Sequence, residues 1–154
     1  MRTLPALIAL GLALTGCGTT TAAVSGTPTN SSTPIPTVSI DTTPVSARSS
    51  VGQVVLTLSQ PYGNTHATTS FAVVGTSNSV EANTPWALTN AAHKVVRQGA
   101  FTADGWGDKL YPYSGTVSVA GLPAGTYLFT VRIDDPSDGE GKPVPQVSRV
   151  VLVG

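Results

Sequence analysis

The stretch Leu122-Pro-Ala-Gly-Thr-Tyr-Leu-Phe-Thr-Val-Arg-Ile133 decides the fold class. Its first four residues are typical of a tight turn, because proline fixes one backbone dihedral and glycine accepts conformations that other residues avoid. Beyond the turn, large apolar side chains occupy every second position, a period that places them on one face of a β-strand. The stretch therefore predicts a turn followed by a half-buried strand whose core face consists of Tyr127, Phe129, Val131 and Ile133.

Similar apolar runs, separated by turn residues, occupy the rest of the chain from about residue 54. Their spacing of roughly 8–12 residues predicts an antiparallel β-sandwich of about seven strands. The runs lie at residues 54–58, 71–75, 80–88, 94–96, 111–119, 126–133 and 144–153. Further core faces are predicted at Trp86 with Leu88, and at Tyr113, Gly115, Val117 and Val119. The last run stays ambiguous, because Val147 and the apolar residues at 150–153 do not alternate cleanly.

Two residues favour an immunoglobulin-like sandwich over a barrel. Trp86 lies on the third predicted strand, where such folds place a core tryptophan. Tyr127 follows Gly125 at the start of the sixth strand, the position of a tyrosine corner, whose hydroxyl bonds to upstream backbone. The cysteine pair of antibody domains is absent, since Cys17 is the only cysteine. We therefore predict an all-β, immunoglobulin-like domain over residues 51–154.

Residues 1–16 have the features of a secretory signal peptide. A positive start at Met1-Arg2 precedes the apolar run 4–14, whose length suits such a signal and falls short of the ~20 residues of a spanning helix. Leu14-Thr-Gly-Cys17 resembles the lipobox of bacterial lipoproteins. The resemblance implies that the preceding peptide is removed, that the Cys17 thiol is lipidated and that Cys17 becomes the mature N-terminus, with palmitate among the expected fatty acids. The predicted location is the extracytoplasmic side of the cell membrane. An ordinary secretory signal that contains a cysteine is the alternative.

The segment between the anchor and the domain, residues 17–50, is rich in Ser, Thr and Pro. Its few large apolar residues predict a disordered tether that holds the domain away from the membrane. Eight basic and eight acidic residues give a formal net charge of zero, and no basic stretch occurs. We therefore expect no binding to nucleic acid, and we expect the lipid rather than basic residues to hold the membrane.

The stretch Gly75-Thr-Ser-Asn-Ser-Val-Glu-Ala-Asn-Thr-Pro-Trp-Ala-Leu88 resembles the signature of a bacterial family, the immunoglobulin-like domain of spore germination. Lys94-Val-Val, Gly99, Tyr113-Ser-Gly-Thr-Val117 and Pro123-Ala-Gly-Thr-Tyr127 fit the same pattern, so the resemblance spans about residues 54–153. Asn90-Ala-Ala-His93 departs from it, because the family usually has an Asp/Gly turn there. The resemblance implies an extracytoplasmic binding or scaffolding module without catalytic residues.

The sequence carries little that suggests catalysis. His66 and His93 both lie in predicted turns, and neither a Gly-x-Ser-x-Gly nor a Ser-x-x-Lys motif occurs. We therefore predict a protein that is not an enzyme and has no cofactor besides its lipid, while a serine–histidine–aspartate triad assembled in space stays an alternative.

Carboxylates cluster in two predicted loops. Asp134, Asp135, Asp138 and Glu140, interspersed with glycine, form a weak calcium candidate, since Ca²⁺ takes six to eight oxygen ligands. They lack the register of an EF-hand, and a solvated hairpin loop is the alternative. Asp104 and Asp108 form a second, weaker candidate.

Aromatic residues in predicted loops suggest a binding surface. Trp106 lies between Gly105 and Gly107, with Tyr111 close behind and Tyr62 in an earlier turn. Such side chains stack on sugar rings or anchor protein interfaces. The alternative is a loop that folds back so that Trp106 caps one end of the sandwich. Glu81 either faces a partner or pairs with Lys94 or Arg97 across a hairpin.

The first functional hypothesis is therefore a non-catalytic, lipid-anchored module that binds an envelope protein or cell-wall partner. The second is a carbohydrate-binding module that uses Trp106, Tyr111 and Tyr62 on a cell-wall glycan. The third is an envelope assembly or inhibitor subunit in which an edge strand extends a partner's sheet.

Overall fold

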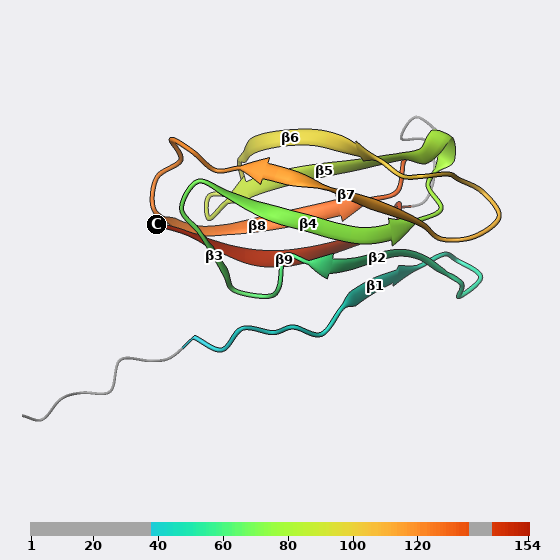
Figure 1. Cartoon of the computed structure of the whole chain (residues 1–154), viewed down its shortest axis with the longest axis horizontal. Helices are drawn as coiled ribbons and strands as arrows, with labels where there is room; N and C mark the ends of the chain where they lie inside the picture. The colour runs from blue at the N-terminus through green and yellow to red at the C-terminus, as the bar shows by residue number, and fades with distance from the viewer. Residues whose placement is uncertain (1–37, 136–142) are drawn as a thin grey trace, which may run out of the picture. The chain divides into compact units, whose positions relative to one another are not determined.

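The computed structural model of the chain describes residues 38–135 and 143–154, and these residues form two β-sheets packed face to face (Figure 1). The smaller sheet has the strand order β1-β2-β4-β7 and the larger one β3-β9-β8-β5-β6. The strands are β1 (Val45–Arg48), β2 (Val54–Gln60), β3 (Thr65–Ala67), β4 (Ser70–Ser77), β5 (Asn83–Asn90), β6 (Val95–Thr102), β7 (Tyr111–Ser118), β8 (Gly125–Arg132) and β9 (Gln146–Val153). The predicted all-β immunoglobulin-like sandwich is confirmed.

All seven predicted strands are present, as β2 and β4 to β9, and two short strands add to them. β1 lies inside the segment predicted as disordered linker, so the ordered domain begins before residue 51. β3 runs parallel to β9, and the sandwich is therefore not wholly antiparallel. The predicted strand 80–88 begins only at Asn83, because Glu81 and Ala82 have φ of 57° and 58° and form a short 3-10 turn, Val80–Ala82.

Aromatic rings join the two sheets across the core. Trp86 of β5 stacks on Phe101 of β6 with centroids 5.8 Å apart, and Phe101 stacks on Tyr113 of β7 at the same separation. Phe129, fully buried on β8, lies 5.2 Å from Phe71 of β4. Trp86 is half-buried, because the residue opposite it on the edge strand β6 is Gly99, which has no side chain to cover the indole, while the predicted core positions Tyr113 and Phe129 are buried.

Tyr127 forms the predicted tyrosine corner. Its hydroxyl donates a hydrogen bond to the Pro123 carbonyl at 2.8 Å, and its ring is buried at the start of β8. A second buried tyrosine, Tyr113, lies over Gly75 and donates to the Thr57 carbonyl at 2.8 Å. On burial the two phenol hydroxyls lose their hydrogen bonds to water, and these two bonds to carbonyl groups replace them.

Buried and more exposed side chains alternate strictly along β9, a pattern that the sequence left ambiguous. Val147, Arg149, Val151 and Val153 are buried on its inner side, and the residues between them are more exposed. The ambiguity arose because the inner position 149 holds an arginine.

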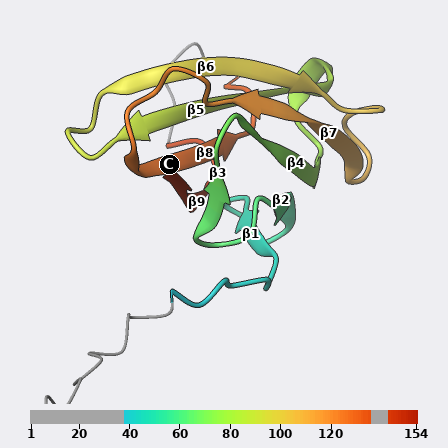
Figure 2. The same ribbon diagram turned by 60° about the vertical axis from the view of Figure 1, so that its left-hand side comes forward.

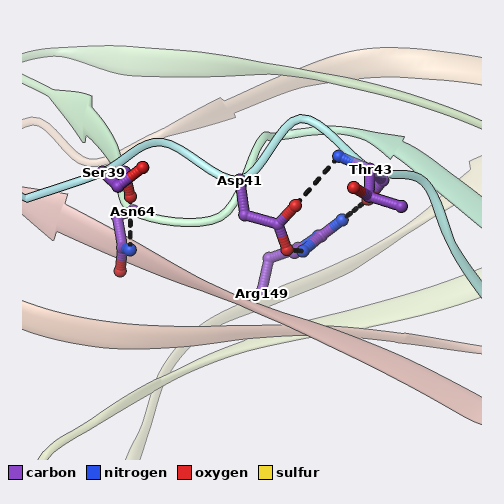
Figure 3. Close-up of polar contacts among 5 residues, drawn as sticks. All are labelled: Ser39, Asp41, Thr43, Asn64 and Arg149. Atoms are coloured by element: carbon purple, nitrogen blue, oxygen red, sulfur yellow. Dashed lines mark hydrogen bonds and ion pairs between the residues drawn. The ribbon is translucent and has the colours of Figure 1, made fainter.

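The segment before β1 is bonded to the sandwich by two side chains (Figure 3). Arg149 forms an ion pair with Asp41 and donates a hydrogen bond to the Thr43 carbonyl. Asn64 donates a hydrogen bond to the Ser39 carbonyl.

Candidate functional site

Trp106 lies at the tip of the loop formed by residues 103–110, which joins β6 to β7, and its side chain is 60% exposed. The loop is closed at its base by backbone hydrogen bonds, from Ala103 to the Ala82 carbonyl at 2.8 Å and from Asp104 to the Pro112 carbonyl at 3.0 Å. Trp106 does not fold back to cap the sandwich. Of the two interpretations open from the sequence, the placement agrees with an exposed aromatic.

Tyr111 organises this loop. Its hydroxyl donates to Asp108 Oδ1 at 2.8 Å, and this bond lowers the pKa of Asp108 and raises the pKa of Tyr111. A side-chain carbon at Gly105 would lie 2.5 Å from the Tyr111 ring, so glycine is required there. The ammonium of Lys109 lies 5.1 Å from the ring centroid, within the range of a cation–π contact. Tyr111, the first residue of β7, is thus held against the loop, whereas the side chain of Trp106 is exposed.

Tyr62 lies at the other end of the sandwich. It is 38% exposed and borders a hollow of about 210 Å³ that is also lined by Ser70 and Phe71, at the start of β4. Tyr111 instead pairs with Ser77, the last residue of β4. Seven residues of extended strand span more than 20 Å. The three aromatic residues of the predicted binding surface are therefore not brought together.

Glu81 is exposed, and of the two interpretations open from the sequence, the pairing with Lys94 or Arg97 is wrong. β5 and β6 pair so that Asn83 lies opposite Thr102, whereas Arg97 lies opposite Leu88. Glu81 is therefore at the end of this hairpin that is far from both cations. Arg97 instead donates to the carbonyls of Val96 and Ala120.

The carboxylates of the calcium candidate have partners where the structure describes them. Asp134 accepts a hydrogen bond from Asn83 at 2.8 Å, and its amide donates to Ser79 Oγ at 2.6 Å. Asp138 and Glu140 lie outside the described residues, as does Cys17. No group of three or more His, Cys, Asp or Glu side chains that could hold a metal occurs in residues 38–135 and 143–154. Calcium binding stays a prediction.

The two histidines lie in separate elements. His66 is an exposed residue of β3, and not of a turn as predicted, while His93 occupies the β5–β6 turn with φ of 58°. Within the described part of the chain, neither imidazole has a hydrogen-bonded serine or aspartate.

A trough on the outer face of the larger sheet was missed by sequence reasoning. It has a volume of about 490 Å³ and runs along β5, whose outward residues Pro85, Ala87 and Thr89 are short. Its sides are formed by neighbouring strands through Val95 and Gln98 of β6, Thr130 and Arg132 of β8, and Gln146 of β9. Short outward residues are unremarkable in the sequence, and only the strand order reveals that longer side chains flank them.

Among the residues that the structure describes, no helix is long and apolar enough to cross a bilayer. Neither the curated proteins nor the solved structures contain a match to this chain.

The sequence profile of one family, the immunoglobulin-like domain of bacterial spore germination, matches residues 55–140, more than half of the 154 residues. The match runs from β2 through β8, and it includes the Gly75–Leu88 stretch and the tyrosine corner. This chain therefore belongs to the family of immunoglobulin-like domains of bacterial spore germination.

Proposed function

We propose that this protein is a non-catalytic binding module, held by lipid on the extracytoplasmic side of the cell membrane, that uses Trp106 to anchor an envelope protein. The observation that carries the proposal is the exposed Trp106 on a loop fixed by Tyr111. Tryptophan is enriched among the residues that contribute most to protein interfaces. A loop that is already ordered loses little conformational entropy on binding.

The arrangement of aromatic residues supports a protein partner over a glycan. The glycan hypothesis required Trp106, Tyr111 and Tyr62 on one surface. Tyr62 lies at the opposite end of the sandwich, and the Tyr111 hydroxyl is bonded to Asp108. One free tryptophan is sufficient for an interface anchor.

The test uses the full chain in native membranes, cross-linked and then captured, with Trp106→Ala beside the original sequence. Val74→Ala is the matched control, because Val74 is 41% exposed on β4, away from the loop. We expect one envelope protein to be recovered with the original chain and with Val74→Ala, and lost with Trp106→Ala. Equal recovery with Trp106→Ala, or recovery of no specific protein, would contradict the proposal.

Lipid anchoring is tested separately on Cys17. We expect the mature chain to begin at Cys17, to carry acyl mass at this residue and to partition into detergent. Cys17→Ser should leave the signal uncleaved at this site and abolish acylation. A mature chain with a free thiol at Cys17 would show that the alternative, an ordinary secretory signal, is right.

The edge strand β6 supports a second candidate, assembly by strand addition. β6 is an eight-residue edge of the larger sheet without proline and with Arg97 as its one charge (Figure 2). The other long edge, β7, carries Pro112, whose carbonyl is already bonded to Asp104. Proline is one of the features that usually protect an edge, and β6 has none, although it carries Arg97 and a register shift between Val95 and Arg97. The Ala103 amide bonds to the carbonyl of Ala82, just before β5, and bonding alternates along the strand, so the backbone groups of Ala100 face the free edge. Ala100→Pro should abolish this assembly in cross-linking.

A further inference from the structure

The trough along β5 combines a small apolar floor with polar side walls. Ala87 lies between Gln98 of β6 and Thr130 of β8. The side chains of Gln98 and Thr130 are longer than that of Ala87, so they form the two walls and Ala87 forms the floor. At one end Arg132 pairs with Gln146 across β8 and β9. Trp86 also lines the trough, but its indole is stacked on Phe101, so the trough offers mainly polar side chains and main chain.

Arg132 differs from the other described arginines. Arg48 donates to the Gly52 carbonyl, Arg97 to two carbonyls, and Arg149 to Asp41. Arg132 is exposed, and in residues 38–135 and 143–154 its guanidinium has no hydrogen bond or ion pair. It is also the one charged residue among those that line the trough.

This chemistry selects an extended, acidic chain. A free guanidinium binds a carboxylate through two parallel hydrogen bonds. The amides of Gln98 and Gln146 both donate and accept, as required to bond the N–H and C=O groups of a peptide backbone. The floor at Pro85 and Ala87 allows that backbone to approach the sheet closely. The volume of about 490 Å³ is within the range of ligand sites.

We propose that the trough binds an extended peptide segment of a partner protein, with an Asp or Glu carboxylate of that segment held by Arg132 and its backbone by Gln98 and Gln146. This site lies on the outer face of the larger sheet and does not depend on the Trp106 loop. Binding through it should weaken as salt is added, because the trough is open to solvent.

The test is a titration of the isotopically labelled full chain, followed by NMR. The probes are a blocked hexapeptide of alternating alanine and glutamate, the same peptide with glutamine for glutamate, and a tri-galacturonate as a carboxylated glycan. We expect the glutamate peptide to shift the signals of Ala87, Gln98 and Gln146. Replacing its glutamates by glutamine should weaken binding at least about tenfold, the effect of losing a charge-assisted contact.

Two variants locate the site. Arg132→Gln should weaken the glutamate peptide by about tenfold, while Arg97→Gln, in which the lost guanidinium is bonded away from the trough, should not. Ala87→Leu should fill the floor of the trough and abolish the NMR shifts caused by the glutamate peptide, while the charge of Arg132 stays unchanged. The proposal is overturned if the peptide shifts no trough residue, if it binds Arg132→Gln equally well, or if the galacturonate binds and the peptide does not.

Discussion

Arg149 and Asp41, 108 residues apart in the sequence, are joined by an ion pair of 2.8 Å between Nη1 and Oδ2. Arg149 is 7% exposed, whereas the Asp41 side chain is 56% exposed. The same guanidinium donates to the Thr43 carbonyl (Figure 3). Asp41 also exchanges backbone hydrogen bonds with Gly63. The buried cation thus fastens the segment before β1 to the sandwich.

Asp41→Asn should release this segment more than Arg149→Met does. The asparagine variant leaves a buried guanidinium without its anionic partner, whereas methionine removes the charge and keeps much of the volume. We expect a clear fall in melting temperature for Asp41→Asn, a smaller change for Arg149→Met, and faster amide exchange at Gly63 in both. If both variants exchange at the original rate, Arg149 does not hold the segment.

Acid should loosen the same contact. Hydrogen bonds from Thr43 and then from Arg149 hold the pKa of Asp41 below its ordinary value of 3.8. A carboxyl group with a lowered folded-state pKa stabilises the fold above its unfolded pKa, and this contribution is lost as pH falls through the folded value. Melting temperature should therefore fall below about pH 4, and Asp41→Asn should flatten this fall. An unchanged acid slope in the variant would contradict the assignment.

The sequence predicted the regular part of this fold because the signal is local. Tyr127, Phe129 and Val131 alternate over a single strand, and the structure buries all three. The Arg149–Asp41 contact has no such signal, since its residues meet only after both sheets form. β1 was missed for a related reason: Val45 and Ala47 are its apolar residues, too few to distinguish it from the linker, and they become ordered by pairing with β2.

The candidate site was predicted in part. The position of Trp106 between two glycines left open an exposed aromatic or one that caps the sandwich, and the structure places it exposed. The sequence did not show that Tyr111 bonds Asp108 or that Tyr62 is remote, because loop geometry and strand order decide both. The trough depends on side-chain lengths across four strands, which no single stretch of sequence encodes.

Gly75→Ala should be strongly destabilising. A methyl group at this position would overlap both the Thr57 carbonyl and the Tyr113 hydroxyl, so the backbone and a buried ring must both move. We expect a loss of about 1–3 kcal/mol or more in the free energy of unfolding, measured by urea titration. Gly99→Ala is the matched control, since there the methyl group meets only the Trp86 side chain, at 2.9 Å. A smaller loss for Gly75→Ala than for Gly99→Ala would refute this explanation.

Tyr113→Phe tests the hydrogen bond alone. The variant keeps the ring that packs on Phe101 and removes the hydroxyl that donates to Thr57. The carbonyl left behind keeps part of its bonding in the sheet, so the expected loss is about 1 kcal/mol in the free energy of unfolding. Urea titration measures it, and an unchanged stability would mean that water replaces the phenol hydroxyl.

Tyr111→Phe should mobilise the Trp106 loop while the sandwich stays folded. Phenylalanine keeps the ring over Gly105 but loses the hydrogen bond to Asp108. We expect a lower heteronuclear NOE at the Trp106 indole N–H, little change in melting temperature, and weaker capture of the envelope partner, because the loop must then be ordered on binding. Tyr62→Phe is the control at the far end of the sandwich and should change none of these. If Tyr111→Phe binds the partner as well as the original chain does, the ordered loop is not what makes Trp106 an anchor.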